Sequence, residues 1–272
     1  MVWFEIILVT LTLLTGVVWL LDKLFFAKRR AKADGLLDEA SEPVVVDYAR
    51  AFFPVLAVVL ILRSFVAEPF RIPSSSMMPT LLIGDFILVN KYAYGLRLPV
   101  NNRKVVEVGQ PERGDVVVFR YPGKGPNDPN TGLDYIKRVI GLPGDTVSYR
   151  DNQLSINGQT LEYATVGEYV GKGPGAEMTG ATELREKLPG REHAVLEDNL
   201  RPVVDQGEGE WVVPPGHYLV IGDNRDRSED GRFWGMLPED RLRGKAFLVW
   251  LNCSGWFCRN SFDASRIGNG IP

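Results

Sequence analysis

The sequence has very little histidine and cysteine and no excess of basic charge. Its 272 residues include only two histidines, His193 and His217, and neither has an acidic partner at a spacing typical of a catalytic triad. A hydroxyl nucleophile activated by histidine is therefore disfavoured. The net charge of −3 argues against a nucleic-acid-binding protein. The length allows one sizeable folded domain with attachments.

The N-terminal residues also lack the lysine or arginine that begins a cleaved secretory signal. Residues 2–21 are twenty positions in which only Glu5 is charged. At about 1.5 Å per residue, a helix of this length crosses the roughly 30 Å core of a bilayer. The basic residues come afterwards, as Lys23, Lys28, Arg29, Arg30 and Lys32. We therefore predict a retained transmembrane helix over 2–21, with its N-terminus outside.

A second apolar run is shorter and leaves two assignments open. Residues 51–62 carry no charge but number only twelve, with Pro54 among them, which suits a buried core helix as well as a membrane span. A span over 48–67 fits if Arg50 and Arg63 reach opposite interfaces. With two spans, the basic segment 22–47 is a cytoplasmic loop and residues 68–272 lie outside. With one span, the large remainder lies in the cytoplasm.

Beyond residue 67 the pattern is typical of strands. Short runs rich in Val, Ile, Phe and Tyr, such as "GDFILVNKYAYG", "GDVVVFRYPG" and "GKAFLVWLN", alternate with turns of Gly, Pro, Asp and Asn. This pattern predicts a mainly β domain, an antiparallel sheet closed into a barrel or packed as a sandwich. Residues 159–210 are rich in Gly and Glu and weakly apolar, and we interpret them as an insertion in the sheet.

A run of three serines and a strand lysine provide a nucleophile and a base that do not require histidine. The serines lie in "PSSSMMPT", residues 73–80, and the lysine lies in "DYIKRVIG", where alternation places Tyr135, Lys137 and Val139 on one face. Such a lysine often packs its stem and extends its ammonium group to water. Buried, it would have a pKa below the ordinary value of about 10.4 and could accept a proton from a hydroxyl group.

A third polar segment, "GDNRDRSEDGRFWG" over residues 222–235, matches a calcium loop only in part. Asp226, Ser228 and Asp230 stand at positions one, three and five, but Leu237 stands at position twelve, where a bidentate glutamate belongs. Three arginines within the segment also oppose a cation. We expect no metal and no cofactor, and we interpret the segment as a hydrogen-bonded network around a buried polar group.

Taken in order, these segments resemble bacterial type I signal peptidases, also called leader peptidases. The stretches that carry the resemblance are "EPFRIPSSSMMPTLLIGDFILVNKYAYG", "RGDVVVFRYP", "LDYIKRVIGLPGD", "GDNRDRSEDGRFWG" and "GKAFLVW". The family implies a multi-pass serine protease of the bacterial cytoplasmic membrane, with a Ser–Lys dyad in a largely antiparallel β domain on the outer, periplasmic side. Its partners are the signal peptides of exported preproteins and membrane lipid. The resemblance favours two spans.

The resemblance also implies a role for individual residues. Ser76 matches the nucleophile, and Lys137 matches the general base that later protonates the leaving amine. The hydroxyl group of Ser74 and the backbone N–H of Ser76 match the oxyanion hole. The residues that orient the lysine and support the site match Ser228, Asp230 and Arg232. The family often has Gly where this chain has Ser75, so we expect an ordinary negative φ there.

Substrate binding is expected along an open strand edge. The resemblance implies that an extended signal-peptide end pairs beside residues 70–76 and 133–137, with small pockets for alanine at the first and third positions before the cut. The candidate lining residues, for which core packing is the alternative, are Phe70, Ile72, Met77, Leu81, Tyr135 and Ile136. The rival functions are a self-cleaving Ser–Lys protease and a non-enzymatic, membrane-anchored β domain that binds envelope proteins.

The two cysteines lie five residues apart in "CSGWFC" near the end of the chain. In an oxidising compartment, this spacing makes Cys253 and Cys258 candidates for a small disulfide loop. Two free buried thiols are the alternative.

Overall fold

The computed structural model describes all residues except 1, 28–29, 31–42, 199–204, 255–257 and 259–260. The chain divides into two compact units. Residues 1–67 and 97–105 form the first unit, and residues 68–96 and 106–272 form the second. Each unit is described by itself below.

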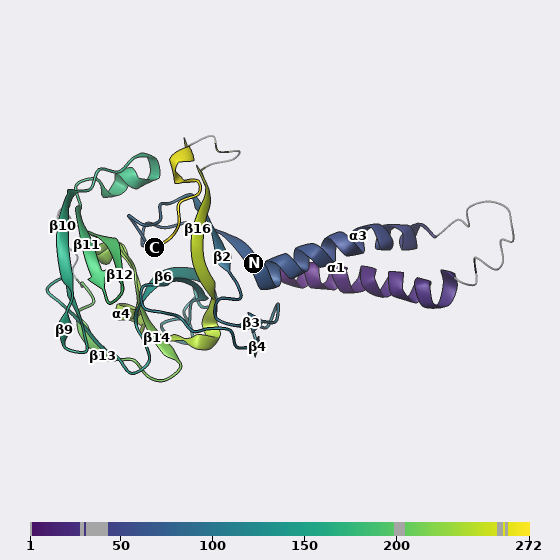
Figure 1. The fold of residues 1–272 in the computed structure, drawn as a ribbon, viewed down its shortest axis with the longest axis horizontal. Coiled ribbons are helices and arrows are strands. Elements are labelled where there is room, and N and C mark those ends of the chain that lie inside the picture. The colour runs from purple at the N-terminus through teal and green to yellow at the C-terminus, as the bar shows by residue number, and fades with distance from the viewer. Residues whose placement is uncertain (1, 28–29, 31–42, 199–204, 255–257, 259–260) are drawn as a thin grey trace. The chain divides into compact units, whose positions relative to one another are not determined.

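The first unit contains two long apolar helices (Figure 1). Helix α1 spans Val2–Leu21 and continues as a π-helical turn over Asp22–Phe26, and helix α3 spans Val44–Ile61 and continues over Leu62–Val66. Both are long and apolar enough to cross a membrane. Helix α3 begins at Val44, four residues before residue 48, the predicted start of the second span, with Pro43 at the N-cap position.

The two helices pack closely through a small residue. A Cβ atom added at Gly16 would lie 2.7 Å from the ring of Phe53, so only glycine leaves room for this ring. Trp19 completes the contact, with its ring centroid 5.5 Å from that of Phe53. Small residues serve the same purpose at the helix interfaces of many membrane proteins.

The second unit is built mainly from antiparallel strands, which confirms the predicted fold class (Figure 1). Its largest sheet has the order β1-β2-β16-β5-β6-β14-β15, with β17 paired to β16. The strands are β1 (Ala67–Arg71), β2 (Asp85–Asn90), β5 (Val116–Arg120), β6 (Asp134–Gly141), β14 (His217–Ile221), β15 (Leu237–Pro238), β16 (Leu242–Ser254) and β17 (Ser261–Phe262). Strands β5, β6 and β16 hold most of the buried apolar side chains of this sheet.

Two smaller sheets accompany it in the second unit. The predicted insertion forms the sheet β10-β11-β12 and contributes outer strands to the sheet β13-β7-β8-β9. A two-stranded ribbon joins β3 and β4, which lie mostly within residues 97–105 of the first unit. The strands are β3 (Leu96–Arg97), β4 (Lys104–Val106), β7 (Thr146–Arg150), β8 (Gln153–Ile156), β9 (Gln159–Thr160), β10 (Glu162–Glu168), β11 (Thr182–Leu188), β12 (Arg191–Glu197) and β13 (Gly209–Val212). Short helical elements span Gly173–Met178, Arg225–Arg227, Gly231–Trp234 (α4), Glu239–Arg241 and Ala264–Arg266.

Strand β6 differs from the half-buried strand that alternation predicts. Every residue from Ile136 to Gly141 is buried, so both faces of the strand are covered. Because both faces are covered, the alternation of apolar residues does not mark an exposed face of the strand. Lys137 and Arg138 point to opposite sides of the strand, and both are buried. Burial on both faces is what places two cationic side chains inside the domain.

The cysteines are joined in this structure. The Sγ atoms of Cys253, at the end of β16, and Cys258 lie 2.05 Å apart in a disulfide. The loop that the disulfide closes follows the longest strand of the main sheet.

Candidate active site

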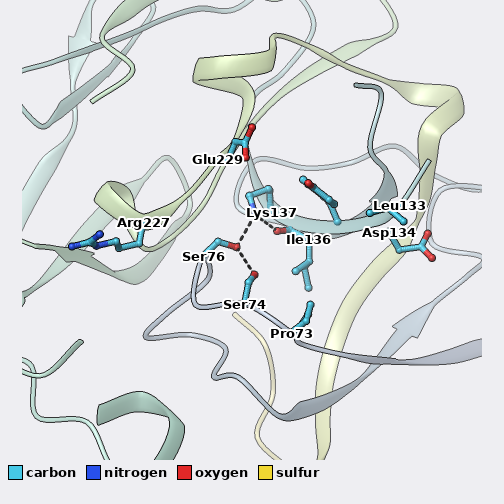
Figure 2. A pocket seen from close by; sticks show the side chains of 10 residues that line it. Pro73, Ser74, Ser76, Leu133, Asp134, Ile136, Lys137, Arg227 and Glu229 are labelled. Atoms are coloured by element: carbon cyan, nitrogen blue, oxygen red, sulfur yellow. Dashed lines mark hydrogen bonds between the residues drawn. The ribbon is translucent and has the colours of Figure 1, made fainter. Parts of the chain in front are cut away.

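Three segments that are distant in the sequence meet at one cavity of about 380 Å³ (Figure 2). They are the serine turn after β1, the first half of β6, and the polar segment after β14. The cavity is lined by Pro73, Ser74, Ser76, Leu133, Asp134, Tyr135, Ile136, Lys137, Arg227 and Glu229. It thus contains both residues that the sequence analysis matches to a catalytic dyad.

Ser76 and Lys137 are in direct contact. The Lys137 Nζ atom donates to Ser76 Oγ at 2.7 Å and to the carbonyl oxygen of Ile136 at 2.9 Å (Figure 2). Only 6% of the Ser76 surface and 4% of the Lys137 surface are exposed. The position of Lys137 along the sheet is set by antiparallel pairing with Val117 of β5. A buried amine is therefore held at hydrogen-bond distance from a buried hydroxyl group.

Burial makes this amine a better base. Desolvation lowers the pKa of Lys137 to about 8, although the carboxylates of Asp230, Asp223 and Glu229 act to raise it. At pH 7 the neutral fraction is then on the order of one tenth, whereas an exposed lysine has a neutral fraction below about 0.001. Neutral Lys137 can accept a proton from the Ser76 hydroxyl group without a histidine.

The turn that carries Ser76 is held by the segment after β14. The side-chain amide of Asn224 donates to the carbonyl oxygen of Ser75 at 3.1 Å. The backbone N–H of Asn224 donates to the carbonyl oxygen of Ser76, also at 3.1 Å. Ser74 Oγ lies 3.3 Å from Ser76 Oγ. The described non-glycine residues with positive φ do not include Ser75, which agrees with the ordinary φ expected at this position. Sequence reasoning missed Asn224, although it lies in the quoted "GDNRDRSEDGRFWG".

Asp230 and Arg232 form a buried pair behind the lysine. The Arg232 guanidinium donates to Asp230 through Nε at 2.9 Å and through Nη2 at 3.0 Å. Burial alone would raise the pKa of Asp230, but the adjacent Arg232 holds it below its ordinary value. Ser228 is also buried, and its hydroxyl group helps to lower the pKa of Asp230. Within the described part of the chain, its Oγ makes no hydrogen bond of good geometry, including to Lys137.

Gly222 is required where these groups approach the serine turn. A Cβ atom at this position would lie 2.2 Å from Ser228 Oγ and 2.4 Å from the carbonyl oxygen of Ser76. Its backbone N–H donates to Asp230 Oδ2 at 2.9 Å. Any side chain here would push the polar segment away from Ser76.

The opposite face of β6 carries a second ion pair that the sequence analysis does not identify. Arg138 donates to both carboxylate oxygens of Asp223, each at 2.8 Å, and the pair is almost fully buried. Thr80, four residues after Ser76, donates to Asp223 Oδ2 at 2.5 Å. Asp223 therefore links strand β6 to the serine segment, and only the fold brings these residues together.

The six candidate substrate-binding residues divide into two groups. Tyr135 and Ile136 line the cavity. The other four belong, together with Ile136, to a buried core cluster that includes residues of β1, β2, β5, β6 and β16, namely Phe70, Ile72, Met77 and Leu81. The apolar pattern of the sequence cannot distinguish a core residue from a pocket residue, because both need the same side chains.

The histidines lie apart from the dyad. His193 is buried beside Glu186 and Asp223, and burial together with the cation of Arg138 lowers its pKa to about 4. His217 begins β14, and its Nδ1 atom lies 3.0 Å from the carbonyl oxygen of Pro215. Over the described ranges, no group of three or more His, Cys, Asp or Glu side chains is arranged to hold a metal ion. Neither histidine contacts Ser76, whereas Lys137 does.

Several known proteins are similar to this chain. The signal peptidase family, peptidase S26, matches residues 45–251. A signal peptidase I from Pseudomonas fluorescens is 46% identical over 92% of each chain. A signal peptidase I from Pseudomonas aeruginosa is 43% identical over 97% of this chain and 98% of its own, and one from Aquifex aeolicus is 34% identical over 73% and 81%. The chain therefore belongs to the signal peptidase family S26 and is a serine peptidase of the signal peptidase I type.

Proposed function

We propose that the chain cleaves signal peptides from exported preproteins, with Ser76 as nucleophile and Lys137 as general base. The contact of 2.7 Å between Lys137 Nζ and Ser76 Oγ inside a closed domain is the observation that carries this proposal. A non-enzymatic β domain would have no reason to enclose a lysine against a serine. A self-cleaving Ser–Lys protease would not need two helices able to cross a membrane.

The reaction follows from the positions of the donors. Neutral Lys137 accepts the hydroxyl proton as Ser76 Oγ attacks the substrate carbonyl carbon. The negative charge on the carbonyl oxygen is stabilised by the backbone N–H of Ser76 and the hydroxyl group of Ser74. The C–N bond then breaks, and the protonated lysine returns the proton to the leaving amine. Water, deprotonated by Lys137, hydrolyses the acyl-enzyme and restores Ser76.

An open strand edge supports binding of an extended substrate. Strand β5 pairs with one edge of β6 over residues 134–138, and β14 pairs with the other edge only from Arg138 onwards. Among the described strands, residues 134–137 thus have a partner on one side only, next to Ser76. An added strand of substrate would place a peptide bond at the nucleophile. The cavity that Pro73 and Ile136 line lies beside this edge and would receive the substrate side chains next to the cut.

The cleavage products of a test peptide show which residues the enzyme requires before the cut. The purified full chain in detergent micelles should cut a peptide that contains an Ala-x-Ala signal-peptide end directly after the second alanine. Mass spectrometry of the two products measures the site of cleavage. A matched peptide with leucine in place of both alanines should be cut at least about tenfold more slowly, because one larger side chain typically costs 1–3 kcal/mol in a closed pocket. Equal rates for the two peptides would contradict the substrate assignment.

The proposed topology places residues 68–272 on the outer, periplasmic side of the bacterial cytoplasmic membrane. The segment between the two helices carries five basic residues between 22 and 32, and such segments remain on the cytoplasmic side. Protease added to intact spheroplasts is expected to degrade the β domain. A cytoplasmic protein serves as the control for membrane integrity. Protection of the β domain until the membrane is lysed would show that the assigned orientation is wrong.

A further inference from the structure

The sheet β10-β11-β12, which belongs to the insertion, contacts the catalytic segments from behind. Met78, two residues after the nucleophile, packs in a buried cluster with Met178, Ala181 and Leu196, all of them insertion residues. Leu196 of β12 also donates its backbone N–H to the carbonyl oxygen of Asp223 at 2.9 Å. The insertion therefore supports both the serine turn and the segment after β14.

One carboxylate of this sheet faces the catalytic segment. Glu186 of β11 is fully buried, and its two oxygens each lie 2.8 Å from a guanidinium nitrogen of Arg225. Tyr163 of β10 donates its hydroxyl group to Glu186 Oε2 at 2.6 Å. Burial would raise the pKa of Glu186, but the cation of Arg225 holds it below its ordinary value, so Glu186 is ionised at neutral pH.

Arg225 connects Glu186 to the groups around Lys137. Its Nε donates to the carbonyl oxygen of Gly222 at 3.2 Å, and its own carbonyl oxygen accepts from Arg232 Nη2 at 2.7 Å. Arg232 in turn binds Asp230, which accepts from the backbone N–H of Gly222. Contacts thus connect Glu186 to Asp230 by way of Arg225, Gly222 and Arg232, and the charge of Asp230 acts on Lys137.

Removal of the Glu186 carboxylate would first affect Arg225. Arg225 would remain buried with its charge uncompensated, and an unpaired buried charge is strongly unfavourable. The guanidinium group would have to move towards water and release its bond to Gly222. The loop would then lose the position that holds Asp230 behind Lys137. A displacement of about 1 Å at a reacting group can reduce the rate about 100-fold.

We propose that Glu186 is a positioning residue of the peptidase reaction, which holds the segment 222–232 against the Ser76–Lys137 dyad through Arg225. This inference rests on the proposed function of the dyad. It also assigns a role to the insertion, whose described residues support the catalytic segments and do not line the cavity.

The test uses the full chain in detergent micelles and the Ala-x-Ala peptide described above. Glu186→Gln is expected to lower kcat about 10- to 100-fold and to leave KM within about twofold, because Glu186 does not line the cavity. The acid limb of the pH profile of kcat/KM should also move to lower pH. The charged groups that face Lys137 are Asp223, Glu229, Asp230 and Arg232, and withdrawal of Asp230 removes the largest of the effects that raise the lysine pKa.

Glu162→Gln is the matched control. Glu162 lies on the same sheet and pairs with Lys187 at 3.1 Å, but both side chains are exposed, so this variant should keep the parental kcat and pH profile. Glu186→Asp retains the charge on a shorter side chain and should recover part of the lost rate.

The outcomes separate a positioning role from a structural one. A Glu186→Gln variant that melts earlier but keeps the parental kcat and acid limb would overturn the inference. If this variant does not fold, Glu186→Asp decides: a lowered kcat at unchanged KM supports the inference, and a parental kcat overturns it. Ser76→Ala, measured in parallel, tests the dyad itself. Activity in that variant would refute the proposed function, whereas an inactive Ser76→Ala beside a fully active Glu186→Gln would refute only the positioning role.

Discussion

Ser76→Ala is expected to reduce cleavage of a signal-peptide substrate to background, a loss on the order of 10⁶-fold in kcat. No covalent intermediate can form without the Oγ atom that Lys137 contacts at 2.7 Å. The substrate should still bind, because the open edge of β6 and the cavity walls do not depend on this hydroxyl group. A competition assay against the uncleaved peptide measures the retained binding, and product formation measures the lost chemistry.

The two neighbouring serines provide graded controls for this prediction. Ser74→Ala removes one donor near the developing oxyanion but leaves the backbone N–H of Ser76, so kcat should fall about 10²–10³-fold with little change in KM. Ser75→Ala should stay within a few-fold of the parent, because only the carbonyl group of Ser75 is used, as an acceptor from Asn224. If Ser75→Ala were the least active of the three variants, the nucleophile would be misassigned.

Lys137→Arg is expected to be inactive although it keeps the positive charge. A guanidinium group stays protonated at all accessible pH values, so it cannot accept the proton of Ser76. Loss of the general base alone lowers the rate by about 10²–10⁴-fold, and loss of the leaving-group acid adds to this. Lys137→Ala should be equally inactive with Ser76 intact. Thermal unfolding of each variant separates a catalytic defect from misfolding, and measurable turnover in a folded arginine variant would eliminate the lysine base.

The pH dependence of the parent enzyme tests the same residue without a mutation. Burial lowers the pKa of Lys137 to about 8, and only the neutral amine can act as a base. The value of kcat/KM should therefore rise with pH, increase most steeply below pH 8, and level off above it. A group with its pKa near the ordinary lysine value of about 10.4 would shift this rise by more than two pH units. A rise centred at that higher pH would show that the base is not a buried lysine.

The charges around Lys137 explain why a lysine in a polar site can be neutral. Two of the three carboxylates that raise its pKa have guanidinium partners of their own: Arg232 binds Asp230, and Arg138 binds Asp223. Their fields at the lysine are therefore partly cancelled, and desolvation remains the largest effect. This arrangement predicts that loss of Arg232 alone would leave Asp230 unpaired and raise the lysine pKa, which reduces the fraction of active base at neutral pH.

Local patterns were sufficient to predict the elements of this chain. One apolar run of membrane-spanning length, a shorter second run that fits a span or a core helix, strand alternation and turn residues all depend on neighbouring positions. They predict helices followed by an antiparallel β domain without three-dimensional information. The proposed dyad rests on a different kind of signal. Ser76 and Lys137 lie 61 positions apart, and no spacing rule connects them, but each lies in a motif that resembles one family.

Only the tertiary structure decided how the motifs meet and which side chains surround them. Strand β6 is covered on both faces, and this burial makes Lys137 a base instead of a surface cation. The contact of Asn224 with Ser75 joins positions 149 apart, and the pair of Glu186 with Arg225 joins positions 39 apart. Such contacts have no signature in the sequence, because a buried polar partner is selected by distance and desolvation in the folded chain and not by its neighbours.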